Sequence, residues 1–189
     1  MKIIKNHRKI SESEKGAIVA VGNFDGIHNG HKALINNIIS LSKIKGKKTA
    51  ICTFNPHPKN FFANGQEINQ ITPQDIKYEI FEKLGIDILY EIEFNHELSI
   101  MSPDEFFNNV LIDGLGLVHV TVGSDFKFGH KRSGDANYLK MCCEANNISF
   151  QSIDKQMDSN AQIYSSSSIR DFISRGDIVN ATNFLGYYW

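Results

Sequence analysis

The sequence predicts an α/β fold in which an open parallel sheet carries helices on both of its faces. Two observations predict this fold class. First, short apolar runs rich in β-branched residues alternate with segments whose apolar residues recur at helical spacing. Second, Gly-rich turns follow several apolar runs, as they do where a buried strand leads into a helix. A chain of 189 residues is long enough for one such domain.

The alternation after residue 16 gives the expected elements in chain order. We expect strands at 17–24, 48–54, 86–93, 117–122 and 148–153, and helices at 30–44, 73–84, 103–113, 134–146, 166–174 and 177–185. Thr72 and Ser102 each place a capping hydroxyl before a proline, which marks two helix starts. Before residue 17, only Ile3 and Ile4 could pair with the first strand. Residues 59–71 lack periodicity and predict a loop, either a lid over a substrate or a plain connector.

Composition and charge narrow the classes of partner. The formal net charge is −1 and the pI is about 6.6, so the charge does not favour nucleic acid or a membrane surface. Cys52, Cys142 and Cys143 show neither zinc spacing nor a disulfide framework, which indicates reduced thiols in a cytoplasmic protein. The first nine residues lack the apolar core of a signal peptide, and no run is long enough to span a bilayer. We expect small-molecule substrates, with no nucleic-acid and no membrane partner.

The stretch from residue 18 to residue 41 carries the strongest functional signal. It joins a buried strand to an amphipathic helix through the turn Gly22-Asn23-Phe24-Asp25-Gly26-Ile27-His28-Asn29-Gly30-His31. Unpaired backbone N–H groups and the positive end of the helix dipole meet at such a turn, so it suits an anion. His28 and His31 share one face of the first helical turn, and Gly30 leaves the backbone bare. The pattern favours a triphosphate site.

Three other interpretations of this turn stay open on the residues alone. The two histidines could be a helix cap and a core residue, which is the usual role of an isolated histidine. They could bind a metal ion with Asp25, although two histidines and one carboxylate within seven residues make a loose metal signature. The glycines could serve only the turn.

A second informative stretch, Cys52-Thr53-Phe54-Asn55-Pro56-His57-Pro58, follows the next expected strand. Ligand-binding loops of open α/β sheets lie at the carboxyl ends of strands. Two prolines stiffen this loop into an apolar wall for a flat ligand, and Phe61 and Phe62 could cover its ring. The alternative is a rigid exit turn whose phenylalanines belong to the core.

A third stretch ends another expected strand on the same rim of the sheet, from Val120 to Gly134. It places Lys127, Lys131 and Arg132 near Asp125, so that its cations could screen phosphates. Phe126 or Phe128 could stack on an aromatic ring. The alternative is a solvated basic loop.

A fourth stretch opens the helix expected at 166–174 with the serine run 165–168 followed by Arg170. Hydroxyl groups at a helix start cap the helix or bind an anion there. An arginine about one turn into the helix can hold a phosphate with its two-pronged guanidinium. The alternative is a capped helix with a surface arginine.

Together these stretches resemble a known family. Gly22 to His31 resembles the nucleotide-binding motif of the HxGH nucleotidylyltransferase superfamily, and its long Asn-Phe-Asp-Gly form resembles the bacterial FAD synthetases, the bifunctional riboflavin kinase/FMN adenylyltransferases. The three later stretches resemble that family in the same order, with Asn55, Ser124 and Lys127 replacing its usual Asp, Glu and Arg. The resemblance covers residues 17–186, and Gly186-Tyr187-Tyr188-Trp189 departs from the family's usual Gly-Arg-Pro-Tyr.

The resemblance implies an open Rossmann-like sheet of the HxGH nucleotidylyltransferase type and in-line transfer of AMP from ATP to FMN, which yields FAD and pyrophosphate. It implies Mg²⁺ as the expected cofactor, with ATP and FMN as substrates. Residues 1–189 are then a single FMN adenylyltransferase domain, with the riboflavin kinase domain of the family absent.

The resemblance also implies roles for individual residues. The expected catalytic residues are His28, His31 and Arg170. The expected ATP-binding residues are Gly22, Asn23, Phe24, Asp25, Gly30, Asp125, Ser165, Ser166 and Ser167. The expected flavin-binding residues are Phe54, Pro56, His57, Pro58, Phe62, Phe126, Phe128 and Arg132. No ligand of a metal ion is assigned.

Two other functions stay open beside this one. A flavin-binding protein without turnover would fit Asn55, Ser124 and the altered final residues, but has no need of both histidines, the serine run and Arg170. A nucleotidylyltransferase with another phosphate acceptor would fit the short HxGH pattern, but the long Phe-Asp-Gly form and the Pro-His-Pro loop count against it.

Overall fold

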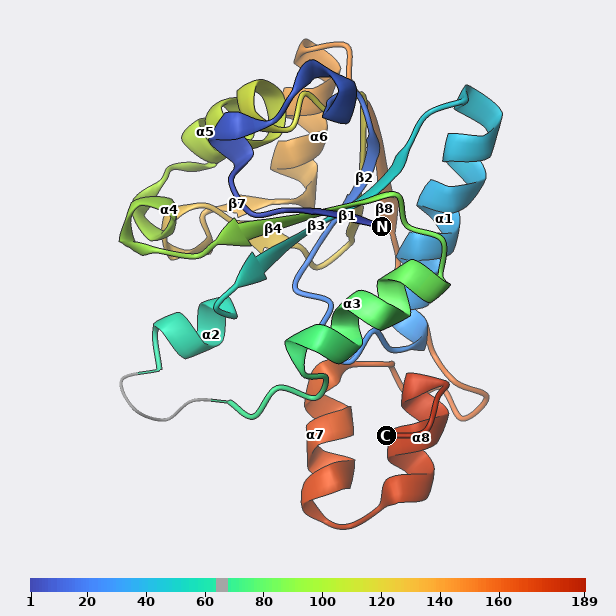
Figure 1. The fold of residues 1–189 in the computed structure, drawn as a ribbon. Helices are drawn as coiled ribbons and strands as arrows, with labels where there is room; N and C mark the ends of the chain where they lie inside the picture. The colour runs from blue at the N-terminus through green and yellow to red at the C-terminus, as the bar shows by residue number, and fades with distance from the viewer. Residues whose placement is uncertain (64–67) are drawn as a thin grey trace.

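The computed structural model describes residues 1–63 and 68–189, and it confirms the predicted α/β class (Figure 1). Six strands form one parallel sheet in the order β1-β4-β3-β2-β5-β8. The strands are β1 (Lys2–Ile4), β2 (Ile18–Val21), β3 (Thr49–Asn55), β4 (Ile88–Glu93), β5 (His119–Gly123) and β8 (Ser149–Ile153).

Helices follow most of the strands, as the alternation of sequence patterns predicts. They are α1 (Asn29–Lys45), α2 (Pro58–Phe61), α3 (Gln74–Lys83), α4 (His96–Ile100), α5 (Pro103–Glu105), α6 (Ala136–Ala145), α7 (Ser166–Ser174) and α8 (Ile178–Leu185). Helix α5 continues into a π-helical segment, Phe106–Gly114, so the two together fill the helix expected at 103–113. Short 3-10 helices occur at His7–Lys9, Glu12–Glu14 and His130–Arg132, and β6 (Lys127–Phe128) pairs with β7 (Gly134–Asp135).

The structure differs from the sequence analysis at three short elements. Strand β1, which contains Ile3 and Ile4, pairs with β4 at the edge of the sheet and not with β2. Part of the loop expected at 59–71 is helix α2, where His57 Nδ1 accepts a hydrogen bond from the backbone of Lys59 at 3.1 Å. Helix α4 was not expected. All three elements are too short to show a period in the sequence. Residues 64–67 of the expected loop lie outside the described residues.

Helices α1 and α3 cover one face of the sheet. Alternate residues of the strands point to this face, among them Ile18 and Ala20 of β2 and Leu89 of β4. They pack against Leu34, Ile35 and Ile38 of α1 and Phe81 of α3, all of them buried. The apolar residues that recur at helical spacing in α1 therefore face the sheet, as predicted.

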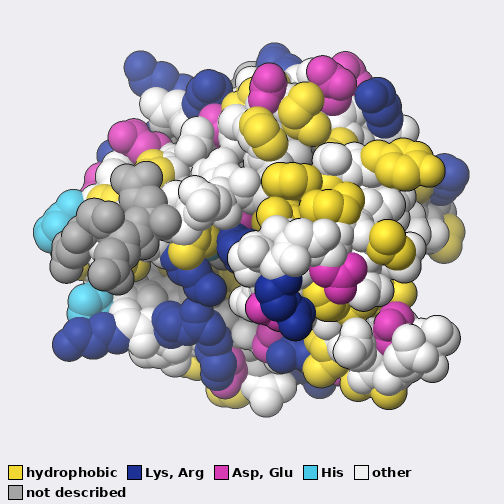
Figure 2. Space-filling model, turned by 90° about the horizontal axis from the view of Figure 1, so that it is seen from below, with side chains coloured by type: hydrophobic (Ala, Val, Ile, Leu, Met, Phe, Trp, Pro, Cys, Tyr) yellow, Lys and Arg dark blue, Asp and Glu magenta, His cyan; other side chains and the backbone are white. Residues whose placement is uncertain are grey.

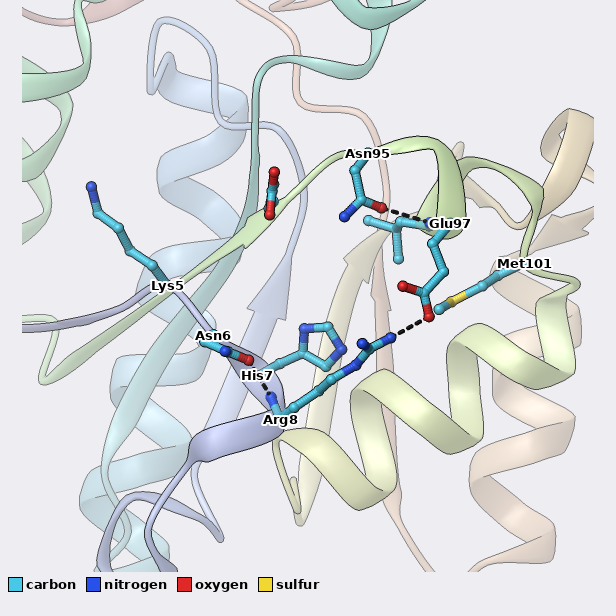
Figure 3. A pocket seen from close by; sticks show the side chains of 9 residues that line it. Lys5, Asn6, His7, Arg8, Asn95, Glu97 and Met101 are labelled. Atoms are coloured by element: carbon cyan, nitrogen blue, oxygen red, sulfur yellow. Dashed lines mark hydrogen bonds and ion pairs between the residues drawn. The ribbon is translucent and has the colours of Figure 1, made fainter.

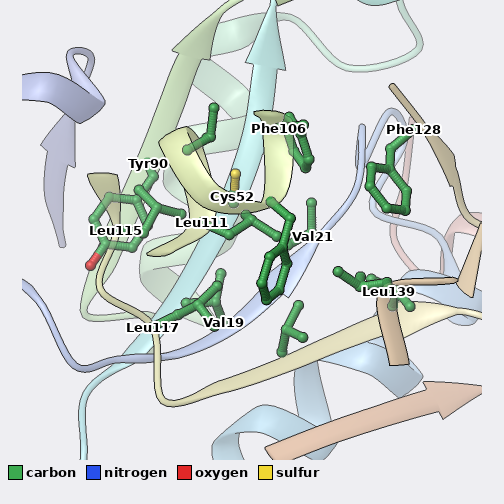
Figure 4. Close-up of a cluster of buried hydrophobic side chains, with 14 of the residues drawn as sticks. Val19, Val21, Cys52, Tyr90, Phe106, Leu111, Leu115, Leu117, Phe128 and Leu139 are labelled. Atoms are coloured by element: carbon green, nitrogen blue, oxygen red, sulfur yellow. The ribbon is translucent and has the colours of Figure 1, made fainter. Parts of the chain in front are cut away.

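The π-helical segment and α6 cover the opposite face. Val19 and Val21 of β2, Cys52 of β3 and Tyr90 of β4 point to this face and pack against a buried cluster that includes Phe106, Leu111, Phe128 and Leu139 (Figure 4). The strands therefore bury side chains on both faces, which explains why their sequences are continuously apolar.

Helices α7 and α8 lie side by side below the sheet in Figure 1 and form a third apolar cluster. This cluster contains Ile169 of α7, together with Ala181, Phe184 and Leu185 of α8, and it includes Ile71 from the segment before α3. Polar contacts join it to the start of α1, where Asn29 donates to the carbonyl of Asn183 at 2.9 Å and Lys32 donates to that of Leu185 at 3.0 Å.

The order of the strands places a topological switch point beside β2. The chain runs from β2 through β3 to β4 on one side, and then returns to β5 on the other side of β2. Loops diverge at the carboxyl ends of strands at such a point and leave a crevice for a ligand. No helix in the described part of the chain is both long and apolar enough to cross a bilayer.

Candidate active site

One large cleft of about 1090 Å³ lies at the carboxyl ends of the central strands. All four informative stretches of the sequence meet there, although they are up to about 150 residues apart in the chain. The predicted residues that line the cleft are Gly22, Asn23, Phe24, Asp25, His28, Gly30, His31, Phe54, His57, Pro58, Phe62, Asp125, Phe126, Phe128, Arg132, Ser165, Ser166, Ser167 and Arg170. Pro56 is exposed and is not among the lining residues.

His28 and His31 stand together at the start of α1. His28 is the N-cap of the helix, and its Nδ1 accepts a hydrogen bond from the backbone N–H of His31 at 3.3 Å. The two rings stack with centroids 3.7 Å apart. Phe24 lies against His31 with ring centroids 5.2 Å apart, and it is itself completely buried against Phe81. Phe24 therefore supports the imidazole pair from the core side.

Burial keeps both imidazoles neutral near pH 7. Desolvation lowers the pKa of His28 to about 4, although the nearby Asp125 carboxylate acts in the opposite direction. The pKa of His31 lies well below its usual value because the ring is enclosed and is close to His28 and Lys77. Since His28 Nδ1 accepts a hydrogen bond, the neutral ring carries its proton on Nε2. Nδ1 of His31 is buried and has no partner among the described residues. A buried polar atom without a protein partner is unusual and needs an explanation, such as a bound water molecule or a ligand.

Asp25 links the HxGH turn to α7. Its carboxylate is buried and forms an ion pair with Arg170, whose Nε also donates to the carbonyl of Asn69 at 3.0 Å. The other carboxylate oxygen accepts from the backbone N–H groups of Ile71 at 2.9 Å and Thr72 at 3.4 Å. This carboxylate is thus held by protein donors, and the aspartate positions Arg170 at the edge of the cleft.

The serine run caps α7 and lies against the HxGH turn. Ser165 is the N-cap, and its Oγ accepts from the backbone of Ser168 at 3.0 Å. Ser166 donates to the carbonyl of Asp25 at 2.8 Å. A Cβ added to Gly30 would lie 3.4 Å from Tyr164 Cβ and 3.1 Å from the His28 ring, so the two helix starts touch here. The N-termini of α1 and α7 therefore face one region, which favours an anion.

The loop after β5 lines another side of the cleft. Phe126 and Phe128 stack with ring centroids 5.5 Å apart, and Phe128 is buried. Asp125 forms an ion pair with Lys155 at 3.1 Å, and its side chain is exposed at the rim. Lys131 and Arg132 have φ angles of 52° and 61°, which are unusual for residues other than glycine. Strained backbone of this kind is concentrated at functional sites.

Aromatic rings form a further side of the cleft, called here the aromatic wall. Phe54 at the end of β3 packs against Phe94, with ring centroids 6.1 Å apart. Phe62 packs against Phe94 at 5.8 Å and is 59% exposed, so its outer face is free for a ligand. Phe94 was missed by the sequence analysis. Its signal was its position directly after a buried strand, on the same rim as the other loops.

His57 and Pro58 line the cleft beside the aromatic wall. His57 is buried and caps α2, and burial lowers the pKa of its imidazole to about 4. Pro58 occupies the first position of α2, which suits its fixed φ.

Lys77 of α3 is a buried cation that the sequence analysis did not identify. Its side chain is inside the molecule, and its Nζ donates to the carbonyl of Asn23 at 3.3 Å. Burial lowers its pKa, while the Asp25 and Glu91 carboxylates act in the opposite direction. Lys77 lies four residues before Phe81 on the buried face of α3, and this position was the available signal. It adds positive charge beneath the HxGH turn.

Cationic side chains form part of the lining of the cleft. Figure 2 views the molecule from below, and Lys and Arg side chains gather at the centre and lower left of this face. Six Lys and Arg side chains line the cleft: Lys59, Lys127, Lys131, Arg132, Lys155 and Arg170. Lys127 and Lys155 form ion pairs with Asp135 and Asp125, whereas Lys131 and Arg132 make none with other described residues. Unpaired cations at a rim suit a phosphate-bearing ligand.

A second, smaller pocket of about 170 Å³ lies where β1 and β4 end (Figure 3). Within this pocket Arg8 forms an ion pair with Glu97. Asn95 accepts from the backbone of Leu98 at 3.0 Å, which caps α4. No residue predicted for the site lines this pocket.

Comparison with known proteins finds matches in sequence to one family. The model of the FAD synthetase family matches residues 10–167. The chain is 35% identical over 191 residues to a bifunctional riboflavin kinase/FMN adenylyltransferase of Listeria monocytogenes, covering 99% of this chain and 60% of that protein. It is 34% identical to a protein named FAD synthetase from the same organism, covering 95% of this chain and 72% of that one. A bifunctional protein of Bacillus subtilis is 31% identical, with 95% and 56% covered. The chain thus spans about 60% of the length of the bifunctional relatives.

Two solved structures resemble the fold. A structure titled macrolide-efflux protein from Streptococcus pneumoniae superposes with a TM-score of 0.84 at 24% identity, and the match covers 98% of this chain and 61% of that one. A pantoate-beta-alanine ligase from Francisella tularensis superposes with a TM-score of 0.58 at 16% identity, covering 97% and 78%. The matches in sequence decide the family, and the matches in structure agree with its open Rossmann-like sheet. The chain belongs to the FAD synthetase family.

Proposed function

We propose that the chain is an FMN adenylyltransferase, which makes FAD and pyrophosphate from ATP and FMN. The observation that carries the proposal is that one cleft joins an anion-binding rim to an aromatic wall. His28, His31 and the start of α7 form the rim, and Phe54 and Phe62 belong to the wall. Adenylyl transfer needs both parts in one cavity, because the triphosphate and the flavin phosphate must meet in line. This activity belongs to FAD biosynthesis and riboflavin metabolism.

The rim binds ATP in this proposal. His28 and His31 donate hydrogen bonds to the phosphates and to the charge that develops as pyrophosphate leaves. Arg170 and the α7 N-terminus hold the leaving pyrophosphate, and Asp125 orients the nucleotide or its magnesium ion. The remaining ATP contacts come from the turn and the serine run: Gly22, Asn23, Phe24, Asp25, Gly30, Ser165, Ser166 and Ser167. In this proposal Asp25 acts by positioning Arg170, because protein donors already hold its carboxylate.

The aromatic side binds the flavin in this proposal. Rings and prolines suit the flat isoalloxazine, and cations suit the phosphate of FMN. The proposed flavin contacts are Phe54, His57, Pro58, Phe62, Phe126, Phe128 and Arg132, without Pro56, which does not line the cleft. Phe94 joins them, because it packs on both Phe54 and Phe62.

The proposed reaction needs no nucleophile from the protein. A phosphate oxygen of FMN attacks the α-phosphorus of ATP, the bond from that phosphorus to the bridging oxygen breaks, and pyrophosphate departs. A magnesium ion bound with ATP would be held largely by the nucleotide phosphates and would neutralise part of their charge. This suits the described residues, which include no group of three or more His, Cys, Asp or Glu side chains placed to hold a metal ion.

Incubation with ATP, Mg²⁺ and FMN, followed by chromatography and a pyrophosphate assay, tests the proposal. We expect FAD and pyrophosphate in equal amounts, and neither when ATP is omitted. Tight FMN binding with no pyrophosphate would indicate a flavin-binding protein without turnover. Pyrophosphate release that depends on phosphopantetheine or a nicotinate nucleotide, and not on FMN, would indicate another acceptor.

The variant His28→Asn tests the role of His28 while keeping the helix cap. Asparagine is a good N-cap, so the variant keeps the start of α1 and removes only the imidazole. We expect FAD formation to fall on the order of 100-fold with little change in the free energy of unfolding. Near-normal turnover by a folded His28→Asn variant would contradict the role given to His28.

We also infer a cytoplasmic location. All three cysteines are free thiols. Free thiols, two of them adjacent, suit a reducing compartment.

A further inference from the structure

We propose that Tyr187 and Trp189 form an aromatic strap that positions Arg170 for the phosphates of the nucleotide. This inference rests on the proposed function, because it assigns Arg170 to the pyrophosphate. The strap is made of the two aromatic residues alone, and the exposed Tyr188 lies between them. The strap acts through the segment from Asn69 to Thr72, which reaches both Asp25 and Arg170.

The first link of the argument is the setting of Arg170. Its guanidinium pairs with the Asp25 carboxylate, and its Nε donates to the carbonyl of Asn69 at 3.0 Å. Five N–H donors are available on an arginine, so this pairing leaves others for a ligand. Arg170 lines the cleft, and its side chain is 22% exposed. The direction of the guanidinium is therefore set by Asp25 and by the backbone at Asn69.

The second link is the setting of Asp25. Its Oδ1 accepts from the backbone of Ile71 at 2.9 Å and from that of Thr72 at 3.4 Å. The same short segment thus holds both members of the ion pair, since the carbonyl of Asn69 accepts from Arg170 and the backbone N–H of Ile71 donates to Asp25. If this segment moved, both the carboxylate and the guanidinium would lose a partner.

The third link is the strap itself. Trp189 Nε1 donates to the carbonyl of Ile71 at 2.9 Å. The hydroxyl of Tyr187 donates to the carbonyl of Gly26 at 2.7 Å and lies 3.0 Å from Thr72 Oγ1. The strap therefore bonds the 69–72 segment from outside and ties it to the residue that follows Asp25. Tyr187 is partly buried and its pKa is raised by burial, which keeps the hydroxyl protonated as a donor.

These contacts form a closed circuit through four segments of the chain: residues 25–26, 69–72, 170 and 187–189. The circuit runs from Arg170 to Asp25, from Asp25 to Ile71 and Thr72, and from these to the strap, which also reaches Gly26 of the HxGH turn. Small errors in the position of a catalytic group are costly in rate. A group that only fixes this position is a positioning residue, and the strap has that character because neither of its residues lines the cleft.

The kinetic test compares Tyr187→Phe with Tyr188→Phe. The first variant removes the hydroxyl that bonds Gly26 and keeps the ring, whereas the second removes a hydroxyl from a side chain that is 93% exposed. We expect Tyr187→Phe to lower kcat about 10-fold with the KM for FMN unchanged. We expect Tyr188→Phe to match the parent chain.

Arg170→Ala supplies the readout that a purely structural role would not move. If the strap acts through Arg170, adding Tyr187→Phe to Arg170→Ala lowers kcat no further. Equal fold losses in both backgrounds would overturn the proposal. A Tyr187→Phe variant that melts at a lower temperature but keeps the parent kcat would also overturn it.

Fluorescence gives a second readout that needs no catalysis. Trp189 is the only tryptophan in the chain, so its emission reports the strap directly. We expect Tyr187→Phe and Asp25→Asn each to shift this emission to longer wavelength, because both loosen the segment that holds the indole. Unchanged emission in Asp25→Asn would contradict the circuit. If the parent chain made no FAD, the proposed function would fail, while this measurement would still decide whether the circuit exists.

Discussion

At the scale of single residues, the surroundings of a histidine decide what it can do. His28, His57 and His119 are all buried, and desolvation lowers the pKa of each to about 4. Only His28 and His57 line the cleft. His119 instead contacts Ser149 and Thr121 at 2.9 and 2.8 Å in a polar network beneath α1. A lowered pKa therefore does not distinguish His28 and His57 from His119, whereas their position in the cleft does.

These lowered pKa values predict that the protein loses stability in mild acid. Histidines in the unfolded chain take up protons near pH 6.5, whereas the buried rings resist protonation until about pH 4. The unfolded state therefore binds more protons in this window, and the free energy of unfolding falls as the pH falls through it. We expect a loss of about 2 kcal/mol for each of the three rings between pH 7 and pH 5, measured by urea unfolding.

The variant His119→Gln is the control for this pH dependence. Glutamine can still hydrogen-bond to Ser149 or Thr121 but does not titrate, and position 119 is outside the cleft. We expect its unfolding free energy to depend less on pH by about 2 kcal/mol over the same window. A pH dependence equal to that of the parent chain would show that His119 does not resist protonation.

At the scale of elements, the start of α7 combines an observed helix cap with a proposed anion site, and the sequence does not separate the two. Ser165 caps the helix by accepting from the backbone of Ser168, and Ser166 binds the carbonyl of Asp25. The same turn also directs backbone N–H groups and the positive end of its dipole toward the cleft. Capping therefore coexists here with the anion binding that we propose, and variants of different charge can separate the two.

A pair of substitutions at Ser165 tests this element. Ser165→Ala removes the cap and should lower the free energy of unfolding by about 1 kcal/mol. Ser165→Asp keeps a capping oxygen but adds a negative charge beside the proposed phosphate site. We expect it to preserve stability and to weaken ATP binding by roughly 10-fold or more in calorimetry without FMN. ATP binding by Ser165→Asp as tight as that of the parent chain would place the phosphates elsewhere.

At the scale of the whole molecule, the site lies between parts that are packed separately. The sheet has one apolar cluster on each face, whereas α7 and α8 share a small third cluster with Ile71. Polar contacts connect this third part to the rest, including those of Asn29, Lys32 and Asp25. The site therefore depends on how α7 and α8 dock against the start of α1.

This organisation predicts unequal protection against amide hydrogen exchange. Backbone amides of α7 and α8 should exchange faster than those of β2 and β5, because fewer buried apolar contacts hold the helices. Since the proposed nucleotide bridges α1 and α7, we expect ATP to slow exchange in α7 more than in the sheet. Mass spectrometry can follow both regions in one experiment. Equal protection of all elements, unchanged by ATP, would contradict this picture.

The sequence predicted much of the fold because its signals are periodic. All five expected strands and all six expected helices occur, since long apolar patterns report which face of an element is buried. Elements of three to five residues, such as β1, α2 and α4, were missed or not assigned because they show no period. The partner of Ile3 and Ile4 was also unpredictable, because pairing at a sheet edge depends on the order of the strands.

For the site, the sequence by itself determined which chemical groups are present, because each informative stretch couples a turn to a strand end or a helix start. Only the tertiary structure decided how these groups are used. It turned Asp25 inward onto Arg170, placed Phe24 beneath His31, and brought Phe94 and Lys77 to the site without a local motif. The physical reason is that burial and partner choice depend on contacts between segments far apart in the chain, and a local pattern does not encode them.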